Sequence, residues 1–149
     1  MNTIKIKYPS KISINKIKQY FKKYNLSFLF DYVDDQKKGV NDMISSKPYG
    51  SDINDLYRLH EFILINKRTT ILEFGCGWSS LVMLNALLLN QKKYLDKINN
   101  LRINEPFKIF TVDNEKKFLN IAKKRTVNFF GKKSKNVSFI YSECIMTNF

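Results

Sequence analysis

The residues best suited to chemistry lie where two predicted strands end. The β-rich run Thr70 to Phe74 is followed by Gly75-Cys76-Gly77 and then by Ser79 and Ser80, and a second β-rich run ends at Asp113. The glycines allow a tight turn that a ligand can approach, while N–H groups and hydroxyls at a helix start can hold an anionic group. A carboxylate at a strand end can accept both hydroxyl protons of a ribose. Together these residues predict a site for a nucleoside-containing cofactor.

The elements that position these residues alternate between strands and helices. A strand at 70–74 precedes a helix from Ser79 to about Lys93, a strand at 108–113 precedes a helix ending near Asn128, and a third strand follows at 137–141. Strands that alternate with helices pair in parallel, and their ligands bind beyond the carboxyl ends of the strands. We therefore expect an α/β fold with an open parallel sheet of three strands in the order 3-2-1.

Three segments connect these elements. The polar stretch Lys92 to Pro106 is predicted to be an inserted loop, and Gly131 to Lys135 is predicted to be a second loop. Asn114 is predicted to cap the helix after the second strand. Because these segments are polar, they belong at the surface, outside the packed strands and helices.

The front of the chain differs from this alternating part. Ser13 to Tyr24 has the pattern of a basic amphipathic helix, Asn25 to Gly50 is irregular, and Ser51 or Asp52 can cap the next helix. His60 lies on the apolar face of that helix, where a histidine is more often a packing residue than a base. We expect a helical or irregular extension at 1–50 and a cofactor-binding domain at 51–149.

The residue Glu73 helps to choose between cofactors. A dinucleotide-binding turn has glycine or alanine at its third small position, where this chain has Ser80, and it receives a pyrophosphate. The Glu73 carboxylate would repel a pyrophosphate but attract an amine or a sulfonium. Cys76 has no basic neighbour in the sequence to lower its pKa, and we interpret it as a small packing residue in the turn.

Three motifs in order resemble those of class I S-adenosylmethionine-dependent methyltransferases. Leu72-Glu73-Phe74-Gly75-Cys76-Gly77-Trp78-Ser79-Ser80 is similar to their first motif, E-x-G-x-G-x-S/T. Phe110-Thr111-Val112-Asp113-Asn114-Glu115, with the helix after it, resembles their second strand and helix, and Val137 to Cys144 resembles their third strand. The resemblance implies a Rossmann-like domain that binds S-adenosyl-L-methionine and, in the complete protein, transfers its methyl group.

The resemblance also implies a role for individual residues. Glu73 and the turn Gly75-Cys76-Gly77 would line the methionine end of the cofactor, and Asp113 would hold the ribose. Asn114 would lie near the adenine, and Glu143 would face the adenine amino group. Glu143 stands where the family commonly has aspartate.

The same resemblance predicts that the sheet is incomplete. Members of the family continue with a fourth strand beside the first, and their catalytic groups come from that region and beyond. We therefore expect a chain truncated before the fourth strand, with an exposed first-strand edge through which a homo-oligomer can form. No catalytic residue is named, and the methyl acceptor is left open between a small molecule, a protein and a nucleic acid.

Composition keeps two other functions open. The formal charge of +13 suits a basic nucleic-acid-binding module, and the sheet also suits a nicotinamide-binding, NAD(P)-type oxidoreductase. However, the basic residues are 22 Lys and only 4 Arg, and lysine, isoleucine and asparagine together are typical of AT-rich coding. Two cysteines and one histidine predict no metal site, and the absence of a leader or a long apolar run predicts a cytoplasmic protein without a membrane span.

Overall fold

A computed structural model describes residues 5–33 and 50–143 of the chain. Most of the segment 25–50, which the sequence predicts to be irregular, lies outside these ranges, and so does Cys144 of the third motif. In chain order the elements are α1 (Ile14–Lys23), the 3-10 helix η1 (Ser27–Tyr32), α2 (Ile53–Ile65), β1 (Thr70–Phe74), α3 (Trp78–Ile98), β2 (Lys108–Asp113), α4 (Lys116–Phe130), the 3-10 helix η3 (Gly131–Asn136) and β3 (Val137–Tyr141).

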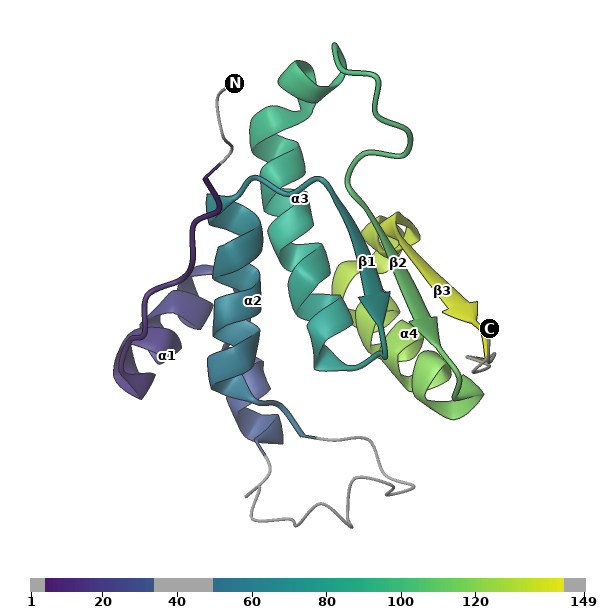
Figure 1. Cartoon of the computed structure of the whole chain (residues 1–149). Coiled ribbons are helices and arrows are strands. Elements are labelled where there is room, and N and C mark those ends of the chain that lie inside the picture. Colours follow the sequence, from purple (N-terminus) through teal and green to yellow (C-terminus); the bar gives the residue numbers. More distant parts are fainter. Residues whose placement is uncertain (1–4, 34–49, 144–149) are drawn as a thin grey trace, which may run out of the picture.

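The three strands form one open parallel sheet in the order β1-β2-β3 (Figure 1). Each strand is rich in β-branched and aromatic residues, which suit a pleated surface. The register pairs Glu73 with Thr111 and Phe74 with Val112, so that β1 and β2 end side by side. The expected α/β class with a parallel open sheet is confirmed.

Helices of the described part of the chain cover one face of the sheet and leave the other open. Ile109 and Thr111 on β2 point to the same face and are fully buried, and α3 and α4 contact each other as well as β2. On the opposite face Leu72 is 60% exposed and Phe74 79% exposed. Within the described residues no helix packs over Leu72 and Phe74, and β1 is an unpaired edge strand.

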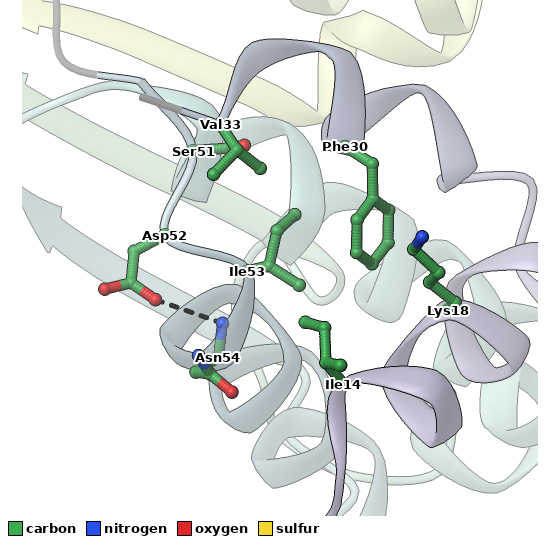
Figure 2. A pocket seen from close by; sticks show the side chains of 8 residues that line it. All are labelled: Ile14, Lys18, Phe30, Val33, Ser51, Asp52, Ile53 and Asn54. Atoms are coloured by element: carbon green, nitrogen blue, oxygen red, sulfur yellow. Dashed lines mark hydrogen bonds between the residues drawn. The ribbon is translucent and has the colours of Figure 1, made fainter. Parts of the chain in front are cut away.

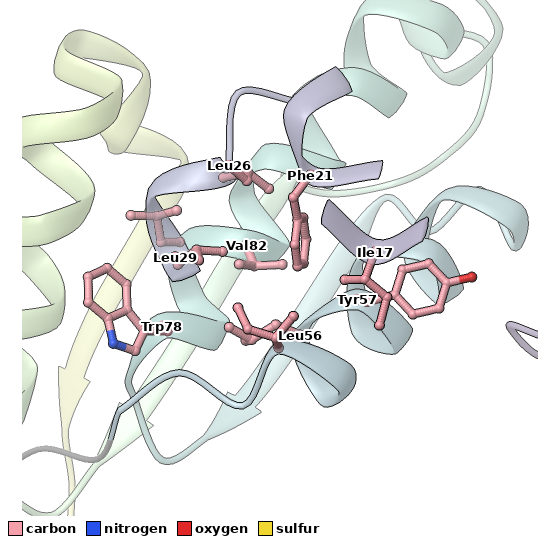
Figure 3. Packing of buried hydrophobic residues seen from close by; sticks show 10 residues of the cluster. Ile17, Phe21, Leu26, Leu29, Leu56, Tyr57, Trp78 and Val82 are labelled. Atoms are coloured by element: carbon pink, nitrogen blue, oxygen red, sulfur yellow. The ribbon is translucent and has the colours of Figure 1, made fainter. Parts of the chain in front are cut away.

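The front of the chain packs onto the α/β part through an apolar cluster. Ile17 and Phe21 of α1 and Leu29 of η1 are buried against Leu56 of α2 and Val82 of α3 (Figure 3). A second cluster fills the space between α2, α3 and the sheet. Burying each of these large side chains contributes about 1.5–3 kcal/mol, which fixes α2 and α3 relative to the sheet.

Asp52 caps α2, as the sequence predicts. Its side-chain carboxylate accepts hydrogen bonds from the backbone N–H groups of Asn54 and Asp55, at 3.0 and 3.1 Å. These N–H groups lack partners inside the helix, and a capping carboxylate also interacts favourably with the helix dipole. The cap holds the amino end of α2 beside the carboxyl ends of the strands (Figure 1).

Four local predictions differ from the structure. The helix α3 continues to Ile98, well into the predicted loop at Lys92 to Pro106, because lysine, glutamine and leucine favour helix and its last turns pack on the second cluster. Asn114 is not the cap of α4; that position is Glu115. The segments after α1 and α4 contain η1 and η3 rather than irregular chain.

None of the described helices, α3 included, combines the length and apolarity needed to cross a bilayer.

His60 is a buried packing residue that joins three helices. The Asn85 amide nitrogen donates to the carbonyl of Tyr24, so its oxygen accepts from His60 Nε2 at 3.0 Å. His60 Nδ1 therefore accepts from the hydroxyl of Tyr20 at 2.7 Å. The neutral ring satisfies both contacts, whereas a second ring proton would face the hydroxyl of Tyr20. Burial lowers the pKa of His60 to about 4.

Acid should therefore destabilise the protein through His60. The unfolded chain binds a proton near pH 6.5 and the folded chain only near pH 4, so stability is complete above 6.5 and falls as the pH drops through this window. The pKa difference corresponds to a loss of about 3 kcal/mol. Urea unfolding at a series of pH values measures it. The His60→Gln variant should give a flatter curve, and equal slopes for the two proteins would contradict the assignment.

The uncovered sheet face predicts self-association. An apolar patch next to an unpaired strand edge favours pairing with another molecule, and light scattering should detect dimers or larger species. Phe74→Lys should shift the population toward monomer. Tyr8→Lys is the control, because Tyr8 is about as exposed (76%) but lies far from the sheet in sequence and on no strand. A monodisperse monomer of the unmodified chain would contradict the prediction.

Candidate functional site

A hollow of about 460 Å³ lies where β1 and β2 end. Figure 1 shows the amino ends of α2, α3 and α4 at the same end of the molecule as the strand arrowheads. Ligand pockets commonly have volumes of a few hundred Å³ and sit at this end of parallel sheets. The lining comes from the start of α2, the turn after β1, the start of α4 and one more distant residue of α4: Gly50, Asp52, Asp55, Leu56, Gly75, Cys76, Gly77, Trp78, Ser79, Asp113, Asn114, Glu115, Phe118 and Arg125.

Asp113 joins the two turns that border this hollow. Its Oδ2 accepts a hydrogen bond from the backbone N–H of Cys76, and its Oδ1 accepts one from the N–H of Glu115, each at 2.8 Å. The second bond lets the chain continue one residue past Asn114 before α4 begins, which is why Asn114 does not cap the helix. A carboxylate has about four acceptor positions, so Asp113 can accept from a ligand besides these two N–H groups.

Glu73 is a buried carboxylate at the base of the site, 8% exposed. Its Oε1 accepts from the hydroxyl of Ser79 at 2.5 Å, and its Oε2 accepts from Ser80 and Thr111, each at 2.7 Å. The side chain thus ties β1 to β2 and to the first turn of α3. Burial raises the pKa of Glu73, while the three hydroxyl donors oppose that shift.

This arrangement gives the two serines a different task from the expected one. The sequence suggests that Ser79 and Ser80 hold an anionic ligand group, but in the structure both hydroxyls donate to Glu73. Ser80 is fully buried and does not line the hollow, whereas Ser79 does. A buried carboxylate has lost its water and needs hydrogen-bond donors from the protein, and the hydroxyls of Ser79 and Ser80 supply two of them.

The turn after β1 has the open geometry expected of it. Gly75 has a φ of +82°, a region that favours glycine, and Gly77 is extended. A Cβ atom at either position would meet no atom within 4 Å, so the backbone borders free space. Burial, together with Asp113, raises the pKa of the Cys76 thiol. A protonated thiol agrees with its interpretation as a packing residue.

Trp78 begins α3 and is covered by other side chains. The indole is 7% exposed and lies 4.6 Å from the Tyr32 ring and 6.1 Å from the Phe28 ring, between centroids. The guanidinium carbon of Arg125 lies 3.9 Å from the centre of the Trp78 ring. Trp78 thus packs the start of α3 against η1 and α4 and borders the hollow at one edge.

Glu143 follows β3 and does not line the hollow, although the N–H of the preceding Ser142 donates to the backbone carbonyl of Asp113 at 3.1 Å. Glu143 is exposed and accepts a hydrogen bond from the hydroxyl of Tyr141 at 2.5 Å. Asn114, by contrast, lines the hollow and is exposed there. The structure therefore brings residues that follow β1 and β2 together around the hollow, while Glu143 points to Tyr141 beside it.

Sequence reasoning missed the charged residues that complete the hollow. Asp55, Glu115 and Arg125 line it, and Asp52, the cap of α2, does as well. The acidic residues follow helix starts, which is a signal in the sequence, but only folding brings three helix starts to one place. Arginine is scarce in this chain, and that is the one sequence signal for Arg125.

A second hollow of similar volume lies between α1, η1 and the start of α2 (Figure 2). Ile14, Phe30 and Ile53 make it largely apolar, and Lys18 lies over the Phe30 ring. Its acidic side chain is Asp52, whose carboxylate is engaged in capping α2. Among the described residues it shares Asp52 with the hollow beside β1 and β2 but takes no lining from the strands or the turns after them, and we regard the latter hollow as the candidate site.

Comparison with known proteins returns no match. No protein-family model matches the chain, and neither a curated protein nor a solved structure does. The function is therefore argued from the residues and geometry of this site.

The bonds to Glu73 can be tested by removing one donor. Thr111→Val keeps the branched shape of the side chain but leaves the buried carboxylate with one partner fewer, so the free energy of unfolding at pH 7 should fall by about 1–3 kcal/mol. The loss should shrink in acid, where Glu73 is protonated. Urea unfolding measures both, with Thr70→Val on the exposed end of β1 as the matched control. A similar small effect of the two substitutions would argue against the role of Glu73.

Proposed function

We propose that this chain binds S-adenosyl-L-methionine at the hollow beside β1 and β2, as the cofactor-binding part of a Rossmann-like methyltransferase. The observation that carries the proposal is the charge of the lining. In a chain with a formal charge of +13, the described residues that line the hollow include the four carboxylates Asp52, Asp55, Asp113 and Glu115 and a single guanidinium. An acidic hollow in a basic protein favours a ligand with positive charge, such as a sulfonium with an ammonium group.

The helix starts support the same choice. A free helix start attracts phosphate, as in dinucleotide-binding folds. Here each start already has a carboxylate of the chain: Asp52 caps α2, Asp113 accepts the N–H at the start of α4, and Glu73 lies behind the first turn of α3. A pyrophosphate would meet these negative charges, which disfavours the alternative of an NAD(P)-type oxidoreductase.

The position of Asp113 suits a ribose. It ends β2 beside an open turn, and its carboxylate oxygens can accept from ribose hydroxyls in addition to the two backbone N–H groups. Its bond to Cys76 N–H also holds the turn that would border the rest of the ligand. This double use explains why an acid is needed at this strand end rather than an amide.

Methyl transfer from a sulfonium is an in-line displacement that depends mainly on proximity and orientation. The residues of the candidate site would hold the methyl donor, and no general base is assigned. The acceptor can be a small molecule, a protein or a nucleic acid.

One observation favours a second candidate function, the binding of a nucleic acid. A hollow of about 730 Å³ between α3 and η3 is lined by Lys92, Lys132, Lys133 and Lys135, with Asp96 as its acidic residue. η3 directly precedes β3, so this basic hollow lies toward the amino ends of the strands, away from the acidic one. Lysines gathered in this way attract phosphates, with an affinity that falls steeply as salt rises.

Calorimetric titration with S-adenosylhomocysteine, NADH and a short RNA separates these functions. We expect saturable binding of S-adenosylhomocysteine that weakens at least tenfold in Asp113→Asn, because charged hydrogen bonds to the ribose are lost. Asp31→Asn, on an exposed position of η1 and outside both hollows, is the control with the same change of charge. Thermal unfolding verifies that both variants fold. Saturable binding of NADH alone, or of RNA alone, would overturn the proposal.

A further inference from the structure

Arg125 is the cation among the residues that line the acidic hollow. It comes from the third turn of α4, and its guanidinium stacks on the Trp78 ring at 3.9 Å. Trp78 is itself held by Tyr32, so the guanidinium rests on a buried surface rather than moving freely in solvent. The side chain is half-buried, and this burial lowers the pKa of Arg125.

Arg125 has no ion-pair partner among the described residues, although four carboxylates line the same hollow. Asp55 is paired instead with the exposed Arg58, at 3.4 Å. Nor does the guanidinium donate a hydrogen bond within the described part of the chain. A half-buried arginine normally has its donors engaged, because desolvating a cation without a partner costs free energy.

We propose that Arg125 binds the carboxylate of the ligand's amino-acid group. This inference rests on the proposed function and makes it more specific. The four carboxylates of the hollow suit the sulfonium and ammonium of S-adenosylmethionine but repel its carboxylate. Arg125 removes that conflict, since it places one positive charge inside an otherwise acidic lining.

The stacked geometry favours a carboxylate over other anions of the same charge. A guanidinium that lies over a ring uses its face for the ring and leaves the N–H groups in its plane free. Two of these N–H groups can donate in parallel to the two oxygens of a carboxylate. A lysine at this position would keep the charge but not this paired geometry.

The test compares S-adenosylmethionine with its decarboxylated form, which keeps the sulfonium and the ammonium but lacks the carboxylate. Calorimetry of the unmodified chain should show S-adenosylmethionine binding about tenfold to a hundredfold more tightly, the range expected for charged hydrogen bonds. In Arg125→Gln the preference for S-adenosylmethionine should be lost or reversed, because the lining carboxylates then repel its carboxylate without compensation. Arg125→Lys should keep part of the preference. Arg102→Gln, which removes an exposed arginine that does not line the hollow, should leave the ratio unchanged.

The ratio of the two dissociation constants distinguishes binding of the ligand's carboxylate from a purely structural role of Arg125. If Arg125 only packs on Trp78, the Arg125→Gln variant weakens both ligands equally and keeps the ratio, which overturns the inference. If the unmodified chain binds both ligands equally, the inference fails and the proposed function stands; this is also the result expected if Arg125 serves a carboxylate of the methyl acceptor. If neither ligand binds, the proposed function fails, and the inference with it.

Discussion

The buried carboxylate of Glu73 is the constraint on which the site depends. A charge in this position is tolerable only if hydrogen-bond donors surround it, and the chain provides three hydroxyls, from Ser79, Ser80 and Thr111. Because these donors come from α3 and β2, satisfying Glu73 fixes the start of α3 against the strands. Asp113 then joins the turn after β1 to the turn after β2 through two backbone N–H groups. The border of the hollow is therefore set by two carboxylates whose partners lie on different elements.

The distribution of charge gives the molecule two ends of opposite character. Carboxylates at the starts of α2 and α4 make the hollow beside β1 and β2 acidic, while lysines gather around the hollow between α3 and η3. The net charge of +13 describes neither end, because the chain is basic overall and yet has an acidic hollow beside β1 and β2. Within that hollow Arg125 stands out because carboxylates line the same hollow, yet its guanidinium stacks on the ring of Trp78.

Much of the fold could be predicted because its signals are local. The β-rich runs and the apolar faces of α2 and α4 follow from residue type and period, and Asp52 caps α2 through atoms two and three residues away. The predictions failed where polar composition was taken as loop, as in the last turns of α3, and where Asn114 was preferred as a cap over the turn that Asp113 makes. Helix propensity determines the conformation of the last turns of α3, and the hydrogen bond of Asp113 determines where α4 begins. Neither can be read from the pattern of polar and apolar residues.

By itself the sequence determined the elements, the parallel class of the sheet and the gathering of Gly75, Gly77 and Asp113 at one edge, since the ends of consecutive parallel strands must meet there. The tertiary structure alone decided what each polar group faces. It turned the hydroxyls of Ser79 and Ser80 toward Glu73, left Glu143 outside the hollow, and brought Arg125 to Trp78 across a long stretch of chain. The physical reason is that burial and hydrogen-bond partners depend on distances between elements, which packing sets and residue spacing along the chain does not.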